Sequence, residues 1–341
     1  MQLKNLQQPI NSPFNFHSTA KQIMKKIDLT GKYAIVTGGY SGIGLVTSLA
    51  LAHAGAQVTV PARHPDTARE LFANEPNITV ATLDLMDPHS IDQFADNYLA
   101  SGHPLHILIN SAGIMFPPLR RDSRRYESQF STNHLGHFQL TLRLYPALQK
   151  AHGARVIAVS SRAQRMGSIQ WDDINWEHTP YDPHLAYAQS KVANGLFAVG
   201  LDQYGQTDNI RAFAVHPGLI PTSGLGRASG QYHPFMSRLI NQLGLLHARN
   251  TIEAAKVDFR TADYDYYKTL QQGAATQLWA ATSPQLNDMG GLFLEDSNVA
   301  TAVSANSASR FGVRPWTIDP HDAKRLWTIS EQLTNTKLPQ N

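Results

Sequence analysis

Short apolar segments rich in β-branched residues alternate along this chain with longer segments whose apolar residues recur at helical spacing. The short segments span residues 33–37, 57–60, 78–83, 105–110, 155–160 and 210–215. Buried parallel strands have this composition. The longer segments span residues 45–54, 65–72, 88–100, 124–150 and 183–203. This alternation, without an internal repeat, predicts a parallel sheet covered by helices on both faces.

The alternation stops at about residue 218. Residues 218–268 are rich in glycine and aromatic residues, and the pattern returns with a helix near 273–281, a strand at 292–294 and a last helix near 320–332. We therefore expect one doubly wound α/β domain over residues 28–333, with a mainly parallel seven-stranded sheet. Residues 1–27 are expected to form an N-terminal extension that includes a short capped helix over 18–27. Residues 219–270 are expected to form an elaborated substrate segment.

Composition excludes several classes of function. With 42% apolar and 16% charged residues the chain can form a real core, and its formal charge of +3 contains no dense basic run, so nucleic-acid binding is not expected. The absence of cysteine excludes disulfides, thiolate catalysis and cysteine-based metal sites. No apolar run reaches the length of a membrane span, and the first 30 residues lack a signal-peptide pattern. We expect a soluble cytoplasmic protein.

Four glycines lie within seven residues between the first strand and the helix that follows it. A strand that turns through glycines into a helix directs backbone N–H groups and the positive end of the helix dipole at one point, which suits a phosphate. The alternative is a Gly-rich turn without a ligand. The strand before the loop and the helix after it favour the phosphate site, whose candidate residues are Gly38, Tyr40, Ser41, Gly42, Ile43 and Gly44.

Tyr187 and Lys191 lie four positions apart in the helical segment 183–203, so their side chains share one face. A neighbouring cation lowers the pKa of a phenol, which otherwise lies near 10. The alternative is a surface pair without function, because such pairs arise by chance, and Tyr264 and Lys268 form a second one. That second pair is rejected because it lies in the irregular late segment, with no serine-bearing strand end just before it.

Ser160 and Ser161 end the fifth strand at the carboxyl edge, where open α/β sheets bind ligands. A hydroxyl there can hydrogen-bond a substrate oxygen as its charge changes; the alternative is a serine that caps its own backbone. Val-Ser-Ser, then Tyr-x-x-x-Lys, then Pro217-Gly218, following a Thr-Gly-x-x-x-Gly-Ile-Gly loop, resembles the short-chain dehydrogenase/reductase superfamily, a Rossmann-type family. Residues 18–32 and the length after Gly218 resemble its branch of retinol dehydrogenases and WW-domain-containing oxidoreductases, although no WW domain is present.

The resemblance assigns further roles. It implies that Ser161 rather than Ser160 acts, and that Asn133 anchors a water linking Lys191 to solvent. It also implies cofactor contacts from these residues: Asp84, Leu85, Asn110, Ala112, Gly113, Tyr187, Lys191, Pro217, Gly218 and Thr222. One departure is the wide separation of Ser161 from Tyr187. The extra piece contains Trp171, Trp176 and Tyr181 and lines a substrate pocket or forms a packed surface loop.

Cofactor choice is expected to depend on the end of the second strand. NAD-specific relatives carry an acidic residue there for the ribose 2′-hydroxyl, whereas this chain has Ala62 and Arg63. An arginine can hold a 2′-phosphate as a fork, so NADP(H) is favoured over NAD(H); the alternative is a solvated loop arginine. No His/Glu set has metal-ligand spacing, so no metal is expected.

These residues favour an oxidoreductase that transfers a hydride between NADP(H) and an alcohol, aldehyde or ketone, with Tyr187 as general acid/base. An apolar small molecule is one candidate for the substrate. A nucleotide-sugar epimerase or dehydratase is less favoured because its glycine loop is normally tighter. A non-catalytic NADP-sensing protein is the third reading, against which the intact Ser, Tyr, Lys and Asn set argues. Relatives commonly pair through helices such as 124–150 and 183–203, so a homodimer or homotetramer is expected.

Overall fold

The computed structural model describes residues 6–225 and 267–339, and these contain one eight-stranded sheet. Its strand order is β3-β2-β1-β4-β5-β6-β7-β8, and the first seven strands are parallel. The strands are β1 (Tyr33–Val36), β2 (Gln57–Ala62), β3 (Ile78–Thr82), β4 (Ile107–Asn110), β5 (Ala154–Val159), β6 (Ile210–His216), β7 (Leu292–Glu295) and β8 (Asn298–Val299). The α/β expectation is confirmed. The strand count of seven misses β8, a two-residue antiparallel edge strand too short to show a pattern.

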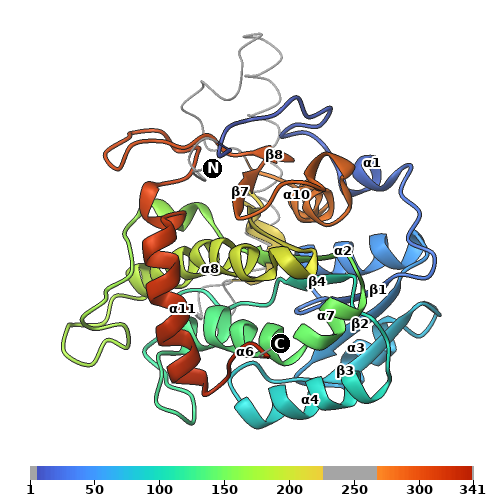
Figure 1. Cartoon of the computed structure of the whole chain (residues 1–341), viewed down its shortest axis with the longest axis horizontal. Coiled ribbons are helices and arrows are strands. Elements are labelled where there is room, and N and C mark those ends of the chain that lie inside the picture. The colour runs from blue at the N-terminus through green and yellow to red at the C-terminus, as the bar shows by residue number, and fades with distance from the viewer. Residues whose placement is uncertain (1–5, 226–266, 340–341) are drawn as a thin grey trace.

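Helices cover both faces of the sheet (Figure 1). One layer contains α1 (Ala20–Met24), α2 (Gly42–His53) and α10 (Leu270–Thr282), and the other contains α4 (Pro88–Ala100), α6 (Gly136–Arg143), α8 (Pro183–Gly205) and α11 (Pro320–Thr334). A shorter helix, α3 (Pro65–Leu71), connects β2 to β3. Neighbouring strand residues alternate between the two cores, as Ile35 and Val36 do.

The long helix expected over residues 124–150 is interrupted. The chain forms α5 (Ser128–Phe130), a π-helical segment (Ser131–Leu135), α6, and then α7 (Tyr145–Lys150), in whose first turn a proline lies. Proline has no backbone N–H to donate to the preceding turn, so the helix breaks there. The helix begins later than expected because the buried carboxylate of Glu127 caps α5 by accepting the N–H groups of Gln129 and Phe130.

The outer face of α8 is covered by α11 of the same chain. A Cβ added at Gly200 would lie 3.0 Å from the ring of Trp327. That ring stacks on Phe197 with centroids 6.2 Å apart. This part of α8 is therefore not available for pairing with a second copy, and the oligomeric state stays a prediction.

The N-terminal segment lies along the β7–β8 hairpin. Gln7 is buried, and its side-chain amide donates to the carbonyls of Phe293 and Ala300 and accepts from the N–H of Phe293. Asn298 exchanges two hydrogen bonds with the backbone of Ile10. Figure 1 accordingly shows the N-terminal end of the chain beside β7 and β8. The edge of the sheet is thus covered by chain that precedes the first strand.

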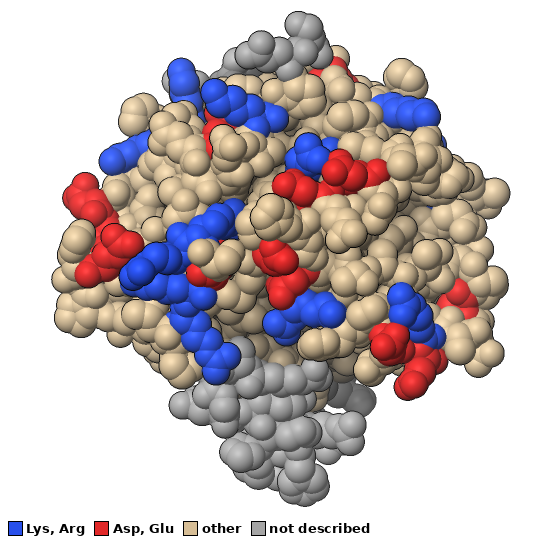
Figure 2. All heavy atoms as spheres, turned by 90° about the horizontal axis from the view of Figure 1, so that it is seen from below, with Lys and Arg blue, Asp and Glu red and all other residues tan. Residues whose placement is uncertain are grey.

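Lysine and arginine side chains are interspersed with acidic ones on the face drawn in Figure 2. That face presents no broad area of one sign, in keeping with the small net charge. Among the residues that the structure describes, no helix is long and apolar enough to cross a membrane.

Candidate active site

Ser161, Tyr187 and Lys191 meet at the carboxyl edge of the sheet. Ser161 is the second residue after β5, and Tyr187 and Lys191 lie one turn apart on α8, with the lysine Nζ 5.6 Å from the tyrosine ring centroid. Asp182 caps α8 by accepting the N–H groups of His184 and Leu185, which fixes where this helix begins. The β5–β6 pairing and the burial of α8 hold the three side chains on rigid elements.

Lys191 is a buried cation. Its side chain is only 3% exposed, and burial lowers its pKa from 10.5 to about 7. Among the described residues, the Val159 carbonyl is the one hydrogen-bond acceptor for its ammonium, at 2.9 Å. Two of its three N–H groups are therefore left for a ligand.

Tyr187 is 4% exposed, and burial raises its pKa to about 12 while a hydrogen bond with the Ser161 side chain opposes this shift. The neighbouring Ser160 is also buried, but its hydroxyl donates to the Lys191 carbonyl at 2.6 Å. Ser160 therefore attaches β5 to α8. The Ser161 hydroxyl accepts the Ala163 N–H at 3.1 Å, which is the backbone cap that the sequence left open as an alternative, and it also lies within hydrogen-bond reach of the Tyr187 phenol.

Asn133 lies inside the π-helical segment and ties three elements together. Its side chain accepts from the Ile114 N–H at 2.9 Å and donates to the Ile114 carbonyl and to the Ser190 hydroxyl. A Cβ added at Gly113 would lie 3.1 Å from the Asn133 Oδ1 and 3.6 Å from the Lys191 Nζ. A side chain at Gly113 would therefore crowd the Asn133 amide, and the chain after β4 passes close to both side chains.

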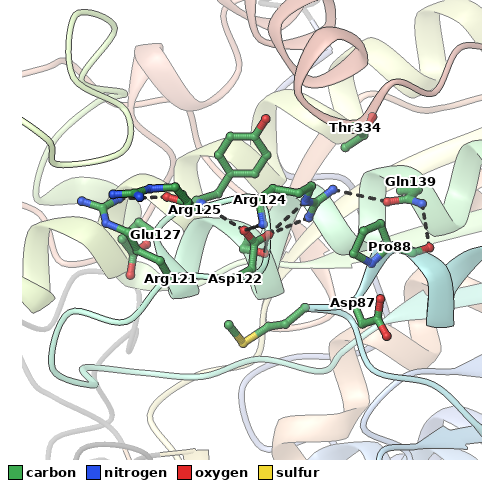
Figure 3. A network of polar contacts seen from close by, with 12 residues as sticks. Asp87, Pro88, Arg121, Asp122, Arg124, Arg125, Glu127, Gln139 and Thr334 are labelled. Carbon is green, nitrogen blue, oxygen red and sulfur yellow. Dashed lines mark hydrogen bonds and ion pairs between the residues drawn. The ribbon is translucent and has the colours of Figure 1, made fainter.

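A buried ion pair anchors the start of this helix (Figure 3). The Asp122 carboxylate is fully buried and accepts from Nε and Nη2 of Arg124 and from the Ser131 hydroxyl. Figure 3 shows Arg124 reaching Gln139 on its other side, and Gln139 donates to the Pro88 carbonyl. The segment that carries Asn133 is thus attached to α4 as well as to its own loop.

Sequence reasoning missed a second support, which joins Thr37 to His137. The Thr37 hydroxyl accepts the N–H groups of Ser111 and Ala112 and lies 2.9 Å from His137 Nε2. The Nδ1 of His137 donates to the Asn133 carbonyl, so Nε2 accepts from Thr37. Burial lowers the His137 pKa to about 4, which keeps the ring neutral at physiological pH. His137 follows Asn133 by four residues in a helical segment, and this spacing could have indicated that the two residues are neighbours.

Phe116 was missed as well. Its backbone is left-handed (φ 57°), and its ring meets the Tyr187 ring edge-on with centroids 5.2 Å apart. The Phe116 N–H donates to Gln129 Oε1, and the Gln129 amide donates to the Tyr181 hydroxyl. A strained backbone beside a reacting group often marks a functional position. In the segment between Ser161 and Tyr187, Tyr181 thus supports Phe116 through Gln129, and the buried Trp176 packs against Tyr181.

The glycine loop is closely packed. Gly38 (φ 65°) and Gly42 (φ 55°) have left-handed backbones, and a Cβ at Gly38 would lie 2.9 Å from the Ala112 Cα. A Cβ at Gly44 would lie 2.3 Å from the Gly38 carbonyl. Ser41 precedes α2 without capping it through its side chain. The loop therefore leaves the positive end of α2 open to an anion.

The remaining candidates lie along the same edge. Asn110 ends β4, and its buried Oδ1 has no hydrogen-bond partner among the described residues. Arg63 is exposed directly after β2. The Asp84 carboxylate accepts the Met86 N–H, beside the buried Leu85. Pro217 and Gly218 follow β6, and Thr222 lies in a 3₁₀ turn (Pro221–Ser223).

Two further sequence expectations concern the segment 219–270 and the absence of a metal site. Tyr264 of the rejected pair and most of the segment 219–270 lie outside the described residues. Among the described residues, Asp319, His321 and Asp322 could offer ligand atoms to a metal, but the Asp319 carboxylate already caps α11. The absence of a metal stays a prediction.

The buried ammonium makes stability depend on pH in a defined direction. The unfolded chain keeps the Lys191 proton up to pH 10.5 and the folded chain loses it above about pH 7, so between these values the unfolded state binds more protons and stability rises with pH. We expect Lys191→Met to raise the free energy of unfolding at pH 7, because it removes the buried charge. The Val159 carbonyl would still accept a hydrogen bond from the Asn194 side chain. The gain over wild type should shrink by up to about 1.4 kcal/mol per pH unit towards pH 10. Urea unfolding at pH 7 and pH 10 measures this, and a gain independent of pH would contradict it.

Gly42→Ala should lower affinity for NAD(P)(H) by at least about tenfold. Its φ of 55° disfavours a side chain, and the added Cβ would lie 2.7 Å from the Ser223 carbonyl. Calorimetric titration measures the affinity, with Gly102→Ala as control because that glycine also has a left-handed backbone but lies far along the chain, after α4. Equal affinity for both folded variants would exclude a phosphate role for the loop.

Comparison with known proteins identifies the family of this chain. The model of the short chain dehydrogenase family matches residues 32–232. A probable oxidoreductase of Streptomyces lividans is 37% identical over 307 residues, covering 88% of this chain and 97% of that protein. Retinol dehydrogenase 12 of Mus musculus is 32% identical over 313 residues, covering 90% and 87%. The crystal structure of an uncharacterized protein from Mycobacterium paratuberculosis superposes with a TM-score of 0.68 at 29% identity, covering 93% and 98%. The chain therefore belongs to the short chain dehydrogenase family and is an NAD(P)-dependent oxidoreductase related to the retinol dehydrogenases.

Proposed function

We propose that this protein transfers a hydride between NADP(H) and an apolar alcohol or carbonyl compound, with Tyr187 as the general acid/base. The observation that carries the proposal is the buried Lys191 ammonium, which lies beside the phenol and has two N–H groups without an acceptor among the described residues. A cation held there lowers the free energy of the phenolate and leaves donors for ribose hydroxyls.

The residues at the sheet edge fit a nicotinamide dinucleotide. The unpartnered Oδ1 of Asn110 and the uncapped start of α2 are polar groups that a bound cofactor would satisfy. When bound, the cofactor supplies or accepts the hydride. The residues of the chain transfer the proton. Ser161 orients the substrate oxygen and Tyr187 exchanges the proton with that oxygen. Asn133 supports a water relay from Lys191.

The alternatives are less favoured. The two relatives reported above are named as a probable oxidoreductase and a retinol dehydrogenase, and neither name describes a nucleotide-sugar epimerase or dehydratase. A protein that only sensed NADP would not need a hydrogen-bonded serine on a buried tyrosine. The Ser161–Tyr187 contact therefore favours catalysis.

An apolar substrate is in keeping with exposed apolar residues near the site residues in the sequence. Leu119, Met166 and Leu185 are large apolar residues at least 38% exposed, and each lies within five residues of Phe116, Ser161 or Tyr187 in the sequence. The relative named retinol dehydrogenase bears the name of an apolar alcohol, in keeping with this proposal.

Tyr187→Phe should reduce turnover by about 10²- to 10⁴-fold while NADP(H) still binds, since the phenol moves the proton and contributes little to affinity. NADPH oxidation against a panel of aldehydes, ketones and quinones measures turnover, and calorimetry measures binding. Tyr204→Phe is the control, because Tyr204 is also on α8 but is 40% exposed. Retention of more than a few per cent of turnover by Tyr187→Phe would refute the assignment.

The proposed preference for NADP(H) rests on Arg63. Its guanidinium can meet a 2′-phosphate with two charge-assisted hydrogen bonds, worth about ten- to a hundredfold in affinity. Arg63→Ala should therefore weaken NADP(H) and change NAD(H) little, and salt should weaken NADP(H) more. Arg69→Ala is the matched control, because that exposed arginine pairs with Asp66 in the next helix. Equal weakening of both cofactors by Arg63→Ala would contradict the assignment.

A further inference from the structure

Lys268 is a fully buried cation that the proposed reaction does not use. It directly follows Tyr267, where the described chain resumes and pairs with Leu219, and its N–H donates to the Leu219 carbonyl at 2.7 Å. Its ammonium lies 2.5 Å from the Asp296 carboxylate. A buried ion pair often adds little to the stability of a fold, because removing both charges from water costs free energy. A role other than stabilisation is therefore sought for this pair.

The Lys268 stem packs directly against Gly218. A Cβ added at Gly218 would lie 2.6 Å from Cδ of Lys268 and 3.0 Å from its Cε. Gly218 has a left-handed backbone (φ 98°) and is the residue where the chain leaves β6 at the cofactor edge. The lysine stem therefore leaves no room for a side chain at this point of the Pro217–Gly218 loop.

The partner carboxylate is held in an unusual turn. Asp296 and Ser297, which join β7 to β8, both have left-handed backbones (φ 51° and 56°), a conformation that is uncommon for residues other than glycine. The turn is attached to α10, because the Ser297 N–H donates to the Thr276 hydroxyl, and to the N-terminal segment, because the Ser12 hydroxyl donates to the Ser297 carbonyl.

The N-terminal segment also reaches the ammonium itself. Phe16 is 3% exposed, and its ring centroid lies 5.2 Å from the Lys268 Nζ, within the range of a cation–π contact. Among the described residues, Lys268 thus contacts the loop after β6, the β7–β8 turn and the N-terminal segment.

We propose that Lys268, Asp296 and Phe16 form a positioning unit that holds the Pro217–Gly218 loop against the nicotinamide half of the cofactor. The inference rests on the proposed function, which places that loop at the cofactor. It gives the N-terminal extension a part in cofactor binding, and it makes Lys268 a positioning residue rather than a catalytic one.

The test compares two ligands that share the adenosine end. NADPH contains the nicotinamide, whereas adenosine 2′,5′-bisphosphate lacks it. Lys268→Met keeps most of the stem and removes the charge, and it should weaken NADPH binding by about tenfold, the size of one lost hydrogen bond, without changing affinity for the bisphosphate. Asp296→Asn and Phe16→Leu should act in the same direction, and Lys268→Met combined with Asp296→Asn should cost less than the two effects added.

Arg155→Met is the matched control. Arg155 is a half-buried cation, and it donates to the carbonyls of Ala280 and Ser283 near the start of β5, away from the cofactor edge. It should lower thermal stability and leave both affinities unchanged.

Equal affinities of Lys268→Met and wild type for NADPH, or equal losses for both ligands, would overturn the positioning unit. If wild-type protein binds neither ligand, the proposed function fails and the inference with it. Normal wild-type binding and turnover with an unaffected Lys268→Met would refute the positioning unit alone.

Discussion

The candidate active site depends on keeping one ammonium out of water. Lys191 is buried with one hydrogen-bond acceptor among the described residues, and this desolvation both lowers its own pKa and is expected to increase its effect on the adjacent phenol. Such a cation opposes folding, so the surrounding structure must be stable without it. The helix that carries it is buried along most of its length and lies between the sheet and α11. Ser160 and Asn194 bond that helix to the end of β5 independently of the ammonium.

Around this cation, neutral side chains hold segments that are distant in the sequence. Asn133 connects the chain after β4 to α8, and His137 connects Asn133 to Thr37 at the end of β1. Each of these groups is hydrogen-bonded, as buried polar groups must be if they are not to destabilise the fold. Because the links cross between elements, a change in one of them is expected to alter geometry at the site without touching a ligand.

Features that depend on neighbouring residues could be predicted from the sequence. The spacing of apolar residues and the composition predicted seven of the eight strands, and the glycine and Tyr-x-x-x-Lys spacing identified residues that the fold brings to one edge of the sheet. Features that depend on pairing between distant residues could not be predicted. The spacing of Lys268 suggested only a chance partner for Tyr264, because its contacts with Asp296 and Gly218 are set by the fold and lie 28 and 50 residues away. The π-helical turn at Asn133 and the left-handed Phe116 likewise arise from tertiary hydrogen bonds that no local propensity encodes.

In the proposed reaction, Tyr187 moves a proton while the cofactor moves a hydride. The most direct measurement is the fate of deuterium carried at the transferable position of C4 in NADPH when the purified protein reduces an apolar aldehyde or ketone. The account predicts an alcohol with one deuterium on the former carbonyl carbon, and a hydroxyl proton that comes from solvent. An alcohol that forms without that carbon-bound deuterium, or NADPH that binds beside the whole carbonyl panel without being oxidised, would contradict it.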